Sequence, residues 1–91
     1  MANYKNLDVW CKAHSLTLAI YQFTATFPGP ERYGLISQMR RASSSIPMYL
    51  AEGSRRASDR DYARFVSNAI GSVNELEYQL LLSEDLGYGR G

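Results

Sequence analysis

Four arginines lie close together near the middle of the sequence, where a turn precedes the start of a helix. Arg55 and Arg56 fall in a breaker segment rich in glycine and serine, and Arg60 and Arg64 follow within the next helix. Guanidinium groups bind phosphate oxygens in pairs, and the dipole of a helix N-terminus attracts anions as well. The segment therefore predicts a contact with the phosphate backbone of RNA or DNA.

The alternative is a solvated loop in which these arginines pair with Asp59, with Asp61 or with a neighbouring subunit. Residues 40–64 contain six arginines and three carboxylates, a net charge of +3, whereas residues 65–91 carry −3. Such a patch is weak in one chain, but several copies in a symmetric oligomer would add avidity. The sequence leaves both interpretations open.

A second charged set predicts ion pairs between helices rather than chemistry. Arg40 and Arg41 lie in one helical segment, and Glu75 and Glu77 lie in another. Arginine matches carboxylates bidentately, so such pairs would fix the register of the two helices. General acid-base catalysis by the two glutamates would need a histidine, cysteine or metal-ligand partner, and the sequence places none near them.

The remaining chemistry-bearing residues are isolated. One histidine, His14, and one cysteine, Cys11, cannot complete a four-ligand zinc site or an intrachain disulfide. The serine run at 43–45 lacks the G-x-S-x-G pattern of a hydrolase, and no glycine-rich phosphate loop is present. We therefore predict no catalytic residue, no metal, no cofactor and no small-molecule substrate, and a protein that is not an enzyme.

Composition predicts one ordinary domain, residues 1–91, in the cytoplasm. Ten Lys plus Arg against nine Asp plus Glu give a net charge of +1, and 45% of residues are hydrophobic. This balance excludes a strongly cationic nucleic-acid module and a polyanionic tail. The longest uncharged run, 13–30, contains Pro28, Gly29 and Pro30, so it is a poor membrane span. No secretory signal is visible, and we expect no membrane partner.

Helical periodicity predicts three helices, at about residues 7–27, 34–52 and 58–86, separated by two breaker clusters. Asn6 is the predicted N-cap of the first helix, and Gly53 a left-handed residue that ends the second. Pro47 interrupts the second helix and predicts a kink, whose loosened carbonyls the serine run at 43–45 can rebond. The apolar face of that helix comprises Leu35, Met39, Ala42, Ile46 and Leu50.

The third helix carries apolar residues on two opposite faces. Ser58 and Asp61 have the spacing of a capping box at its start, and Gly87 stops it. The seam predicted to pack against the other helices comprises Tyr62, Phe65, Ala69, Val73, Leu76 and Leu80. The opposite face would need cover from a partner chain, so it is a predicted homo-oligomer interface, comprising Gly71, Tyr78, Leu81 and Leu82.

Several short blocks together carry a family resemblance. They are YKNLDVW at 4–10, FP at 27–28, RYGL at 32–35, SQMRRA at 37–42, SIP at 45–47, AEG at 51–53, GS at 71–72 and ELE at 75–77. In this order and spacing they resemble the bacterial four-helix-bundle proteins of the 23S rRNA intervening-sequence family. The resemblance implies a small up-and-down bundle that assembles as a homopentameric ring. A related retroelement protein, similar in fold and assembly, binds nucleic acid through a basic surface.

The sequence departs from the family pattern in two places. The family usually continues past residues 84–88 into a fourth helix, whereas this sequence ends at Gly91. After Pro47, Met48-Tyr49-Leu50 replaces the small residue and asparagine that the family generally has, so no role of that asparagine carries over.

These observations predict an all-α, antiparallel up-and-down helical bundle that forms a homo-oligomer, by resemblance a pentamer. The predicted function is non-enzymatic and includes RNA or DNA binding through the arginine-rich loop. The alternative is a protein-interaction scaffold that binds no nucleic acid.

Overall fold

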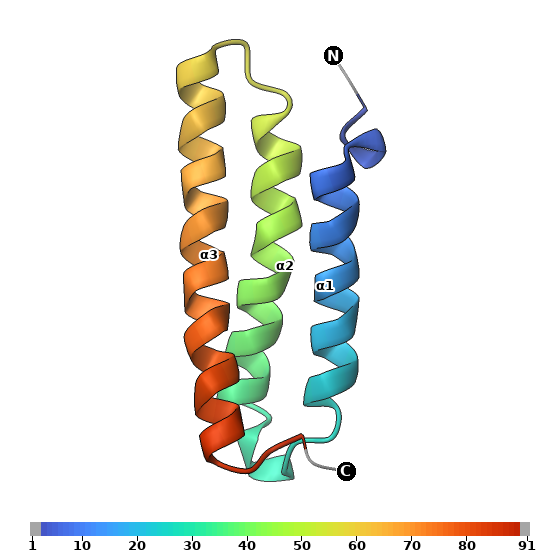
Figure 1. Ribbon diagram of the computed structural model, residues 1–91, viewed down its shortest axis with the longest axis vertical. Coiled ribbons are helices and arrows are strands. Elements are labelled where there is room, and N and C mark those ends of the chain that lie inside the picture. The colour runs from blue at the N-terminus through green and yellow to red at the C-terminus, as the bar shows by residue number, and fades with distance from the viewer. Residues whose placement is uncertain (1–2, 90–91) are drawn as a thin grey trace.

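A computed structural model describes residues 3–89 of the chain, and all of its regular elements are helical. In chain order they are η1 (Tyr4–Asn6), α1 (Asp8–Thr24), η2 (Gly29–Glu31), α2 (Leu35–Gly53) and α3 (Asp59–Asp85). The three long helices run antiparallel, up and down, in a rod of 44 × 21 × 18 Å (Figure 1). The predicted all-α fold is confirmed. Within residues 3–89 there is no strand and no fourth long helix.

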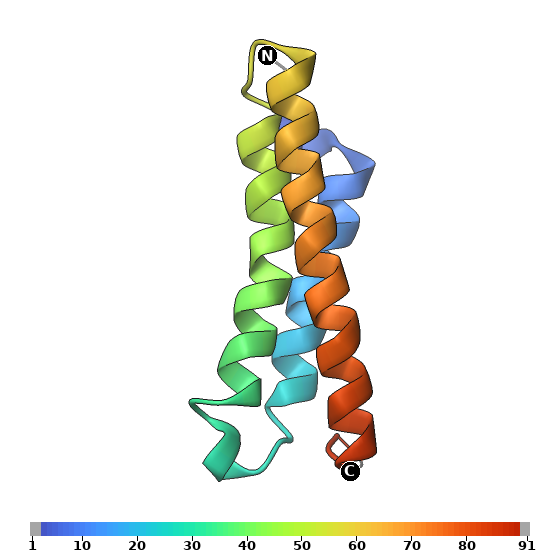
Figure 2. The ribbon, with the colours of Figure 1, turned by 90° about the vertical axis from the view of Figure 1, so that its left-hand side faces the viewer.

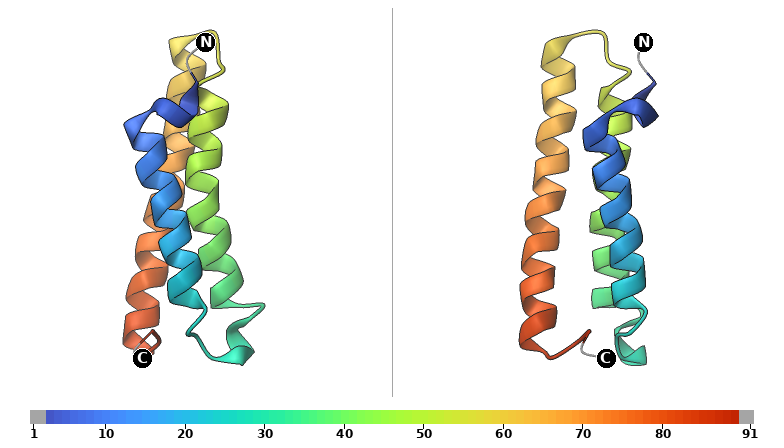
Figure 3. Two further views of the ribbon diagram at one scale, coloured as in Figure 1. Left: turned by 90° about the vertical axis from the view of Figure 1, so that its right-hand side faces the viewer. Right: turned by 45° about the vertical axis from the view of Figure 1, so that its right-hand side comes forward.

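The helix α2 lies between the other two long helices and contacts both of them. The backbones of α1 and α3 do not approach each other as closely, although Phe23 of α1 lines one cavity together with Leu80 and Ser83 of α3. Figure 3 shows the three helices from two further sides. The N-terminal segment and the α2–α3 turn lie at one end of the rod, and the α1–α2 connection lies at the other (Figures 1 and 2). The central helix therefore supplies half of the buried apolar residues, namely Leu35, Met39, Ala42, Ile46 and Leu50, which confirms its predicted face.

Both ends of α1 differ from the sequence prediction. Leu7, and not Asn6, is the N-cap, and it makes no side-chain capping bond. Asn3 caps the preceding turn η1 instead, where its Oδ1 accepts a hydrogen bond from the Lys5 N–H. The helix ends at Thr24 rather than Phe27, because Pro28 cannot continue it and the chain tightens beforehand, with the Phe27 N–H donating to the Thr24 carbonyl.

Pro47 lies inside α2, which continues through it as one helix to Gly53. Proline has no N–H, so the carbonyl of Ser43, four residues earlier, loses its helical donor. That carbonyl instead accepts a hydrogen bond of 2.9 Å from Thr17 Oγ1 on α1, a proton shared with the Ala13 carbonyl at 3.1 Å. The serine hydroxyls bond carbonyls three residues back, so the predicted repair by the serine run is replaced by one from α1.

We expect Thr17→Val to destabilise the fold by about 1–3 kcal/mol, because it leaves the buried Ser43 carbonyl without a donor while keeping the side-chain shape. Chemical denaturation followed by circular dichroism measures this loss. Thr17→Ser retains the hydroxyl and is the matched control. Equal stability of the valine and serine variants would show that the hydroxyl does not stabilise α2 at Pro47.

The helix α3 has the predicted caps at both ends. Ser58 Oγ accepts the Asp61 N–H at 3.1 Å, and Gly87 adopts a left-handed φ of 79°. The N–H groups of Gly87 and Tyr88 then bond the carbonyls of Glu84 and Ser83, the two bonds of a Schellman motif. Gly53 does not have the predicted left-handed conformation. It is the last residue of α2 and has no positive φ. A Cβ there would lie 2.9 Å from Phe65 Cβ, so Gly53 permits the close approach of α3.

The buried face of α3 is rotated from the predicted seam. Val73 is 43% exposed and Tyr62 is 41% exposed, although both were assigned to the packed face. Because α2 is the one long helix whose backbone closely approaches α3, the covered face is narrow, and its residues are Phe65, Ala69, Ser72, Leu76, Gln79 and Ser83. Among the polar members, Ser72 Oγ accepts a hydrogen bond of 2.6 Å from Ser45 Oγ on α2, and Ser83 Oγ donates to the Leu80 carbonyl within α3. The buried Gln79 Oε1 accepts no hydrogen bond from residues 3–89.

The residues after α3 fold back on the α1–α2 connection. Tyr88 packs its ring on Phe27, with 5.2 Å between centroids, and donates its hydroxyl to Glu31 Oε2 at 2.8 Å. Glu31 Oε1 also accepts the Leu35 N–H at the start of α2. The Leu35 bond first, and the Tyr88 bond second, lower the pKa of Glu31. The hydrogen bond to Glu31 raises the pKa of Tyr88. This contact joins the end of α3 to the start of α2.

Candidate nucleic-acid interface

The four predicted arginines lie together at the end of the rod that carries the α2–α3 turn. Arg55 and Arg56 follow the end of α2, and Arg60 and Arg64 belong to the first two turns of α3, whose start Ser58 fixes by its capping bond. All four residues are exposed. We call this group of Arg55, Arg56, Arg60 and Arg64 the arginine cluster.

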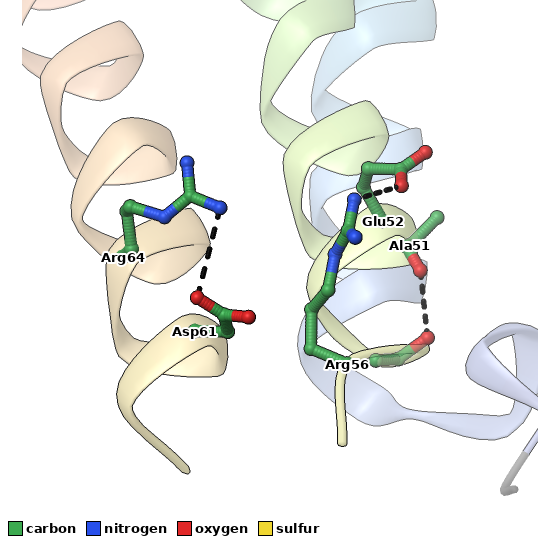
Figure 4. Close-up of polar contacts among 6 residues, drawn as sticks. Ala51, Glu52, Arg56, Asp61 and Arg64 are labelled. Carbon is green, nitrogen blue, oxygen red and sulfur yellow. Dashed lines mark hydrogen bonds and ion pairs between the residues drawn. The ribbon is translucent and has the colours of Figure 1, made fainter. Parts of the chain in front are cut away.

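Two members of the cluster form ion pairs with carboxylates three or four residues earlier in the chain (Figure 4). Arg56 Nη2 lies 2.6 Å from Glu52 Oε2, and Arg64 Nη2 lies 3.7 Å from Asp61 Oδ1. Both pairs are solvent exposed, and such pairs contribute little to stability. Within residues 3–89, Arg55 and Arg60 have no carboxylate oxygen within 4.0 Å. Local pairing therefore accounts for part of the cluster only.

Aromatic rings hold three of the guanidinium groups. Arg56 and Arg64 lie 4.6 and 4.7 Å from the ring centroid of Phe65. Arg55 lies 5.9 Å from the ring of Tyr4, which comes from the N-terminal turn η1. Cation-π contacts at exposed sites orient guanidinium groups without neutralising their charge. The cluster is thus a positioned set of cations interleaved with aromatic side chains.

A cavity of about 390 Å³ opens beside the cluster between η1, α2 and α3. Its lining residues are Tyr4, Met48, Tyr49, Ala51, Glu52, Arg55 and Phe65. Of these, sequence analysis singled out Arg55 alone as a functional residue. Tyr49 and Glu52 are three residues apart, a spacing that makes them neighbours on one face of α2, and Arg55 follows Glu52 by three residues, just after the helix ends. No comparable pattern links Tyr4 to this site.

A second arginine-rich surface, which sequence analysis missed, lies near the other end of α2. Arg32, Arg40 and Arg41 line a cavity of about 440 Å³ together with Tyr21 and Tyr33. Arg40 is committed to structure there, because its Nε donates to Thr24 Oγ1 at 2.9 Å and its Nη2 to the Tyr21 carbonyl at 3.2 Å.

The ion pairs predicted for Arg40 and Arg41 with Glu75 and Glu77 are not formed. Within the described residues, the ion pairs of 4.0 Å or less are Lys12 with Asp8 and the two pairs of the arginine cluster. None of them joins α2 to α3. Arg40 faces α1, where it bonds Thr24. Arg41 and Glu75 line one cavity between α2 and α3 without pairing. Helix register rests on the close contact at Gly53 and the Ser45–Ser72 bond instead.

The predicted oligomer interface on α3 is only partly solvent exposed. Gly71 is exposed, and Tyr78 and Leu81 are exposed by 61% and 54%. Leu82 is half-buried and packs against the core, so it does not belong to that surface. Ile70, which the prediction did not include, is exposed beside these residues. We call Ile70, Gly71, Tyr78 and Leu81 the α3 outer face.

The other isolated residues show ordinary contacts. His14 stacks on Trp10 with 5.1 Å between ring centroids, and the exposed Cys11 thiol donates to the Lys5 carbonyl at 3.2 Å. Across residues 3–89, no group of three or more His, Cys, Asp or Glu residues is placed to hold a metal ion. None of the helices described between these residues has the length and apolarity needed to cross a membrane.

Comparison with known proteins extends over nearly the whole chain. A search of curated proteins gives no match. A family model described as 23S rRNA-intervening sequence protein matches residues 5–90, a range that includes the arginine cluster, the α3 outer face and all three long helices. The match agrees with the sequence blocks from which the resemblance was recognised. This chain therefore belongs to the 23S rRNA-intervening sequence protein family.

Proposed function

We propose that this chain is a non-enzymatic nucleic-acid-binding protein that holds an RNA or DNA backbone on the arginine cluster. The observation that carries the proposal is the cluster itself: four exposed arginines at one end of the rod, of which two have no carboxylate partner within residues 3–89. Exposed guanidinium groups bind phosphate and release its counterions.

The arginine cluster is a better phosphate site than the surface around Arg32 and Arg41. Arg40 is half-buried and fixed on α1 by two hydrogen bonds, so that surface exposes two arginines, whereas the cluster exposes four. At the cluster, the start of α3 adds its N-terminal dipole, which favours a bound anion. Binding of single-stranded RNA, measured by fluorescence anisotropy over a series of salt concentrations, tests the proposal. We expect the affinity to fall steeply with salt.

We further propose that the chain acts as a homo-oligomer, a pentamer by analogy with the ring expected of the family. The α3 outer face supports this, because it presents three large apolar side chains and a glycine to solvent along one side of a helix. Several copies of one cluster on a symmetric assembly would bind a single nucleic acid with an avidity that one chain lacks.

We expect Leu81→Glu to convert the oligomer into smaller species, because it places an unpaired carboxylate at every copy of the interface. Light scattering on a sizing column measures the mass, which for the unmodified chain is that of a pentamer of 10.3 kDa subunits. Leu18→Glu is the matched control, since Leu18 on α1 is similarly exposed, at 52%. A monomeric unmodified chain, or a mass that falls with Leu18→Glu alone, would contradict an interface on α3.

The second candidate function is a protein-interaction scaffold that binds no nucleic acid. The same exposed apolar side chains favour it, because such a face also suits a partner protein. Binding to a protein partner would depend little on salt and would survive nuclease treatment of a lysate. Nucleic-acid binding would show the opposite behaviour in both experiments.

A further inference from the structure

The cavity beside the arginine cluster has the size and lining of a small-ligand site. Its volume of about 390 Å³ falls within the usual range for such sites. Side chains from three separate elements meet there: Tyr4 from η1, Tyr49 from α2 and Phe65 from α3. The rings of Tyr49 and Phe65 lie 6.5 Å apart, and the exposed Met48 extends the apolar wall.

Aromatic walls next to bound phosphates suit an unpaired nucleobase. Bases of single strands stack on Tyr and Phe rings, whereas a base paired within a duplex is already stacked and cannot enter a side pocket. A strand whose phosphates lie on Arg56, Arg60 and Arg64 passes directly beside the cavity, because Arg56 and Arg64 contact the Phe65 ring that lines it.

The two charged residues of the lining distinguish among the four bases. Glu52, an acidic residue, and Arg55, a basic one, both line the cavity. Glu52 Oε2 accepts from Arg56, while Oε1 accepts no hydrogen bond from residues 3–89 (Figure 4). Guanine offers the adjacent N1–H and N2–H donors to a carboxylate, and the O6 and N7 acceptors to a guanidinium. Adenine, cytosine and uracil each lack at least one of these paired sets.

We propose that the cavity binds an unpaired guanine of a single-stranded nucleic acid, with Glu52 on its N1–H and N2–H edge and Arg55 on its O6 and N7 edge. This inference rests on the proposed nucleic-acid function, and it names the substrate class of that site. Arg56 connects the two parts, because it holds Glu52 in place while belonging to the phosphate-binding cluster.

The test compares uridine-rich single-stranded RNAs that carry one central guanosine, inosine, adenosine, cytidine or uridine. Fluorescence anisotropy at one fixed salt concentration gives the affinity of each. We expect the guanosine RNA to bind about tenfold more tightly than the adenosine, cytidine and uridine RNAs, with inosine intermediate because it lacks the N2 amino group. Pairing the guanosine with a complementary strand should abolish this preference.

Glu52→Gln should reduce the preference for guanosine to about twofold or less, because an amide offers one acceptor where the carboxylate offers two. Glu77→Gln is the matched control, since it removes one exposed carboxylate more than three helical turns along α3 from Phe65. The ratio of affinities is the readout, because removing a negative charge raises the affinity for every RNA.

Equal binding of all five RNAs with a steep salt dependence would overturn the guanine site and leave the proposed function standing. A preference for guanosine that persists in Glu52→Gln would also overturn it. Absence of binding to any of the RNAs would overturn the proposed function itself.

Discussion

Replacing Arg55, Arg56, Arg60 and Arg64 together by glutamine should lower the affinity for single-stranded RNA by about two orders of magnitude near physiological salt. Each phosphate contact on a single strand contributes about 0.7 to the slope of log affinity against log salt concentration. Three phosphate contacts, those of Arg56, Arg60 and Arg64, are lost, so that slope falls by about 2. At about 0.15 M salt the same relation gives a loss of affinity of about two orders of magnitude. Glutamine keeps a polar side chain at each position but removes the guanidinium groups that lie over the rings of Tyr4 and Phe65.

The control for this variant removes the same charge from elsewhere on the molecule. Glutamine at Lys5, Lys12, Arg32 and Arg41 changes four exposed cations that lie outside the cluster. We expect this variant to retain a salt slope close to that of the unmodified chain, because its lost charges contact no phosphate. If both variants lose affinity equally, binding depends on net charge and not on the arginine cluster.

Met39→Ala should cost about 2–5 kcal/mol in the free energy of unfolding. Met39 is 0% exposed and lies on the central helix, which contacts both of the other long helices. Truncating it removes apolar contacts and leaves a cavity in the core, which is small in any chain of this length. Each kcal/mol lowers the melting temperature of so small a domain by about 4–8 °C, so thermal unfolding followed by circular dichroism measures the effect.

Met48→Ala supplies the comparison on the same helix. Met48 is 66% exposed, so its truncation should change the free energy of unfolding by about 0.5 kcal/mol or less. Both variants are measured at one protein concentration, because assembly makes apparent stability depend on concentration. A loss for Met39→Ala no larger than that for Met48→Ala would show that the core is not centred on α2.

Most of the fold follows from local signals in the sequence. The spacing of apolar residues identifies the buried face of α2, and the capping pattern at Ser58 and the glycine at 87 give the ends of α3. These signals depend on neighbouring residues in the chain, so they can be recognised without knowing how the helices pack.

Features that depend on packing between helices could not be predicted in this way. The hydrogen bond from Thr17 to the Ser43 carbonyl joins two helices whose relative register the sequence does not state. The apolar pattern of α3 predicts a packed seam that includes Val73, because apolar residues are expected to face the core of a bundle. The backbone of α2 approaches α3 more closely than that of α1 does, and the small polar residues at 72 and 83 are buried in place of Val73.

The candidate site also combines residues that local sequence signals predict with residues that only the packing of the chain brings together. Arg55 and Arg56 can be recognised from their positions in the turn. Glu52, three residues before Arg55, could have been added from its spacing, and Tyr49 from its spacing of three residues to Glu52. Tyr4 belongs to the turn η1 near the N-terminus, more than 40 residues before the other residues of the cavity lining. No local sequence pattern predicts that this turn lies beside the cavity. The ion pairs predicted for Arg40 are not formed, because Thr24 Oγ1 and the Tyr21 carbonyl on α1 accept its hydrogen bonds instead.

The location of the bound strand tests the central claim most directly. Amide chemical shifts of the isotope-labelled chain, recorded while single-stranded RNA is added, report which residues contact it. We predict that the largest changes fall on residues 52–65, which span the end of α2, the turn and the start of α3. Changes centred on Arg32, Tyr33 and Arg41 at the other end of α2, or no changes at all, would contradict the assignment of the arginine cluster as the nucleic-acid interface.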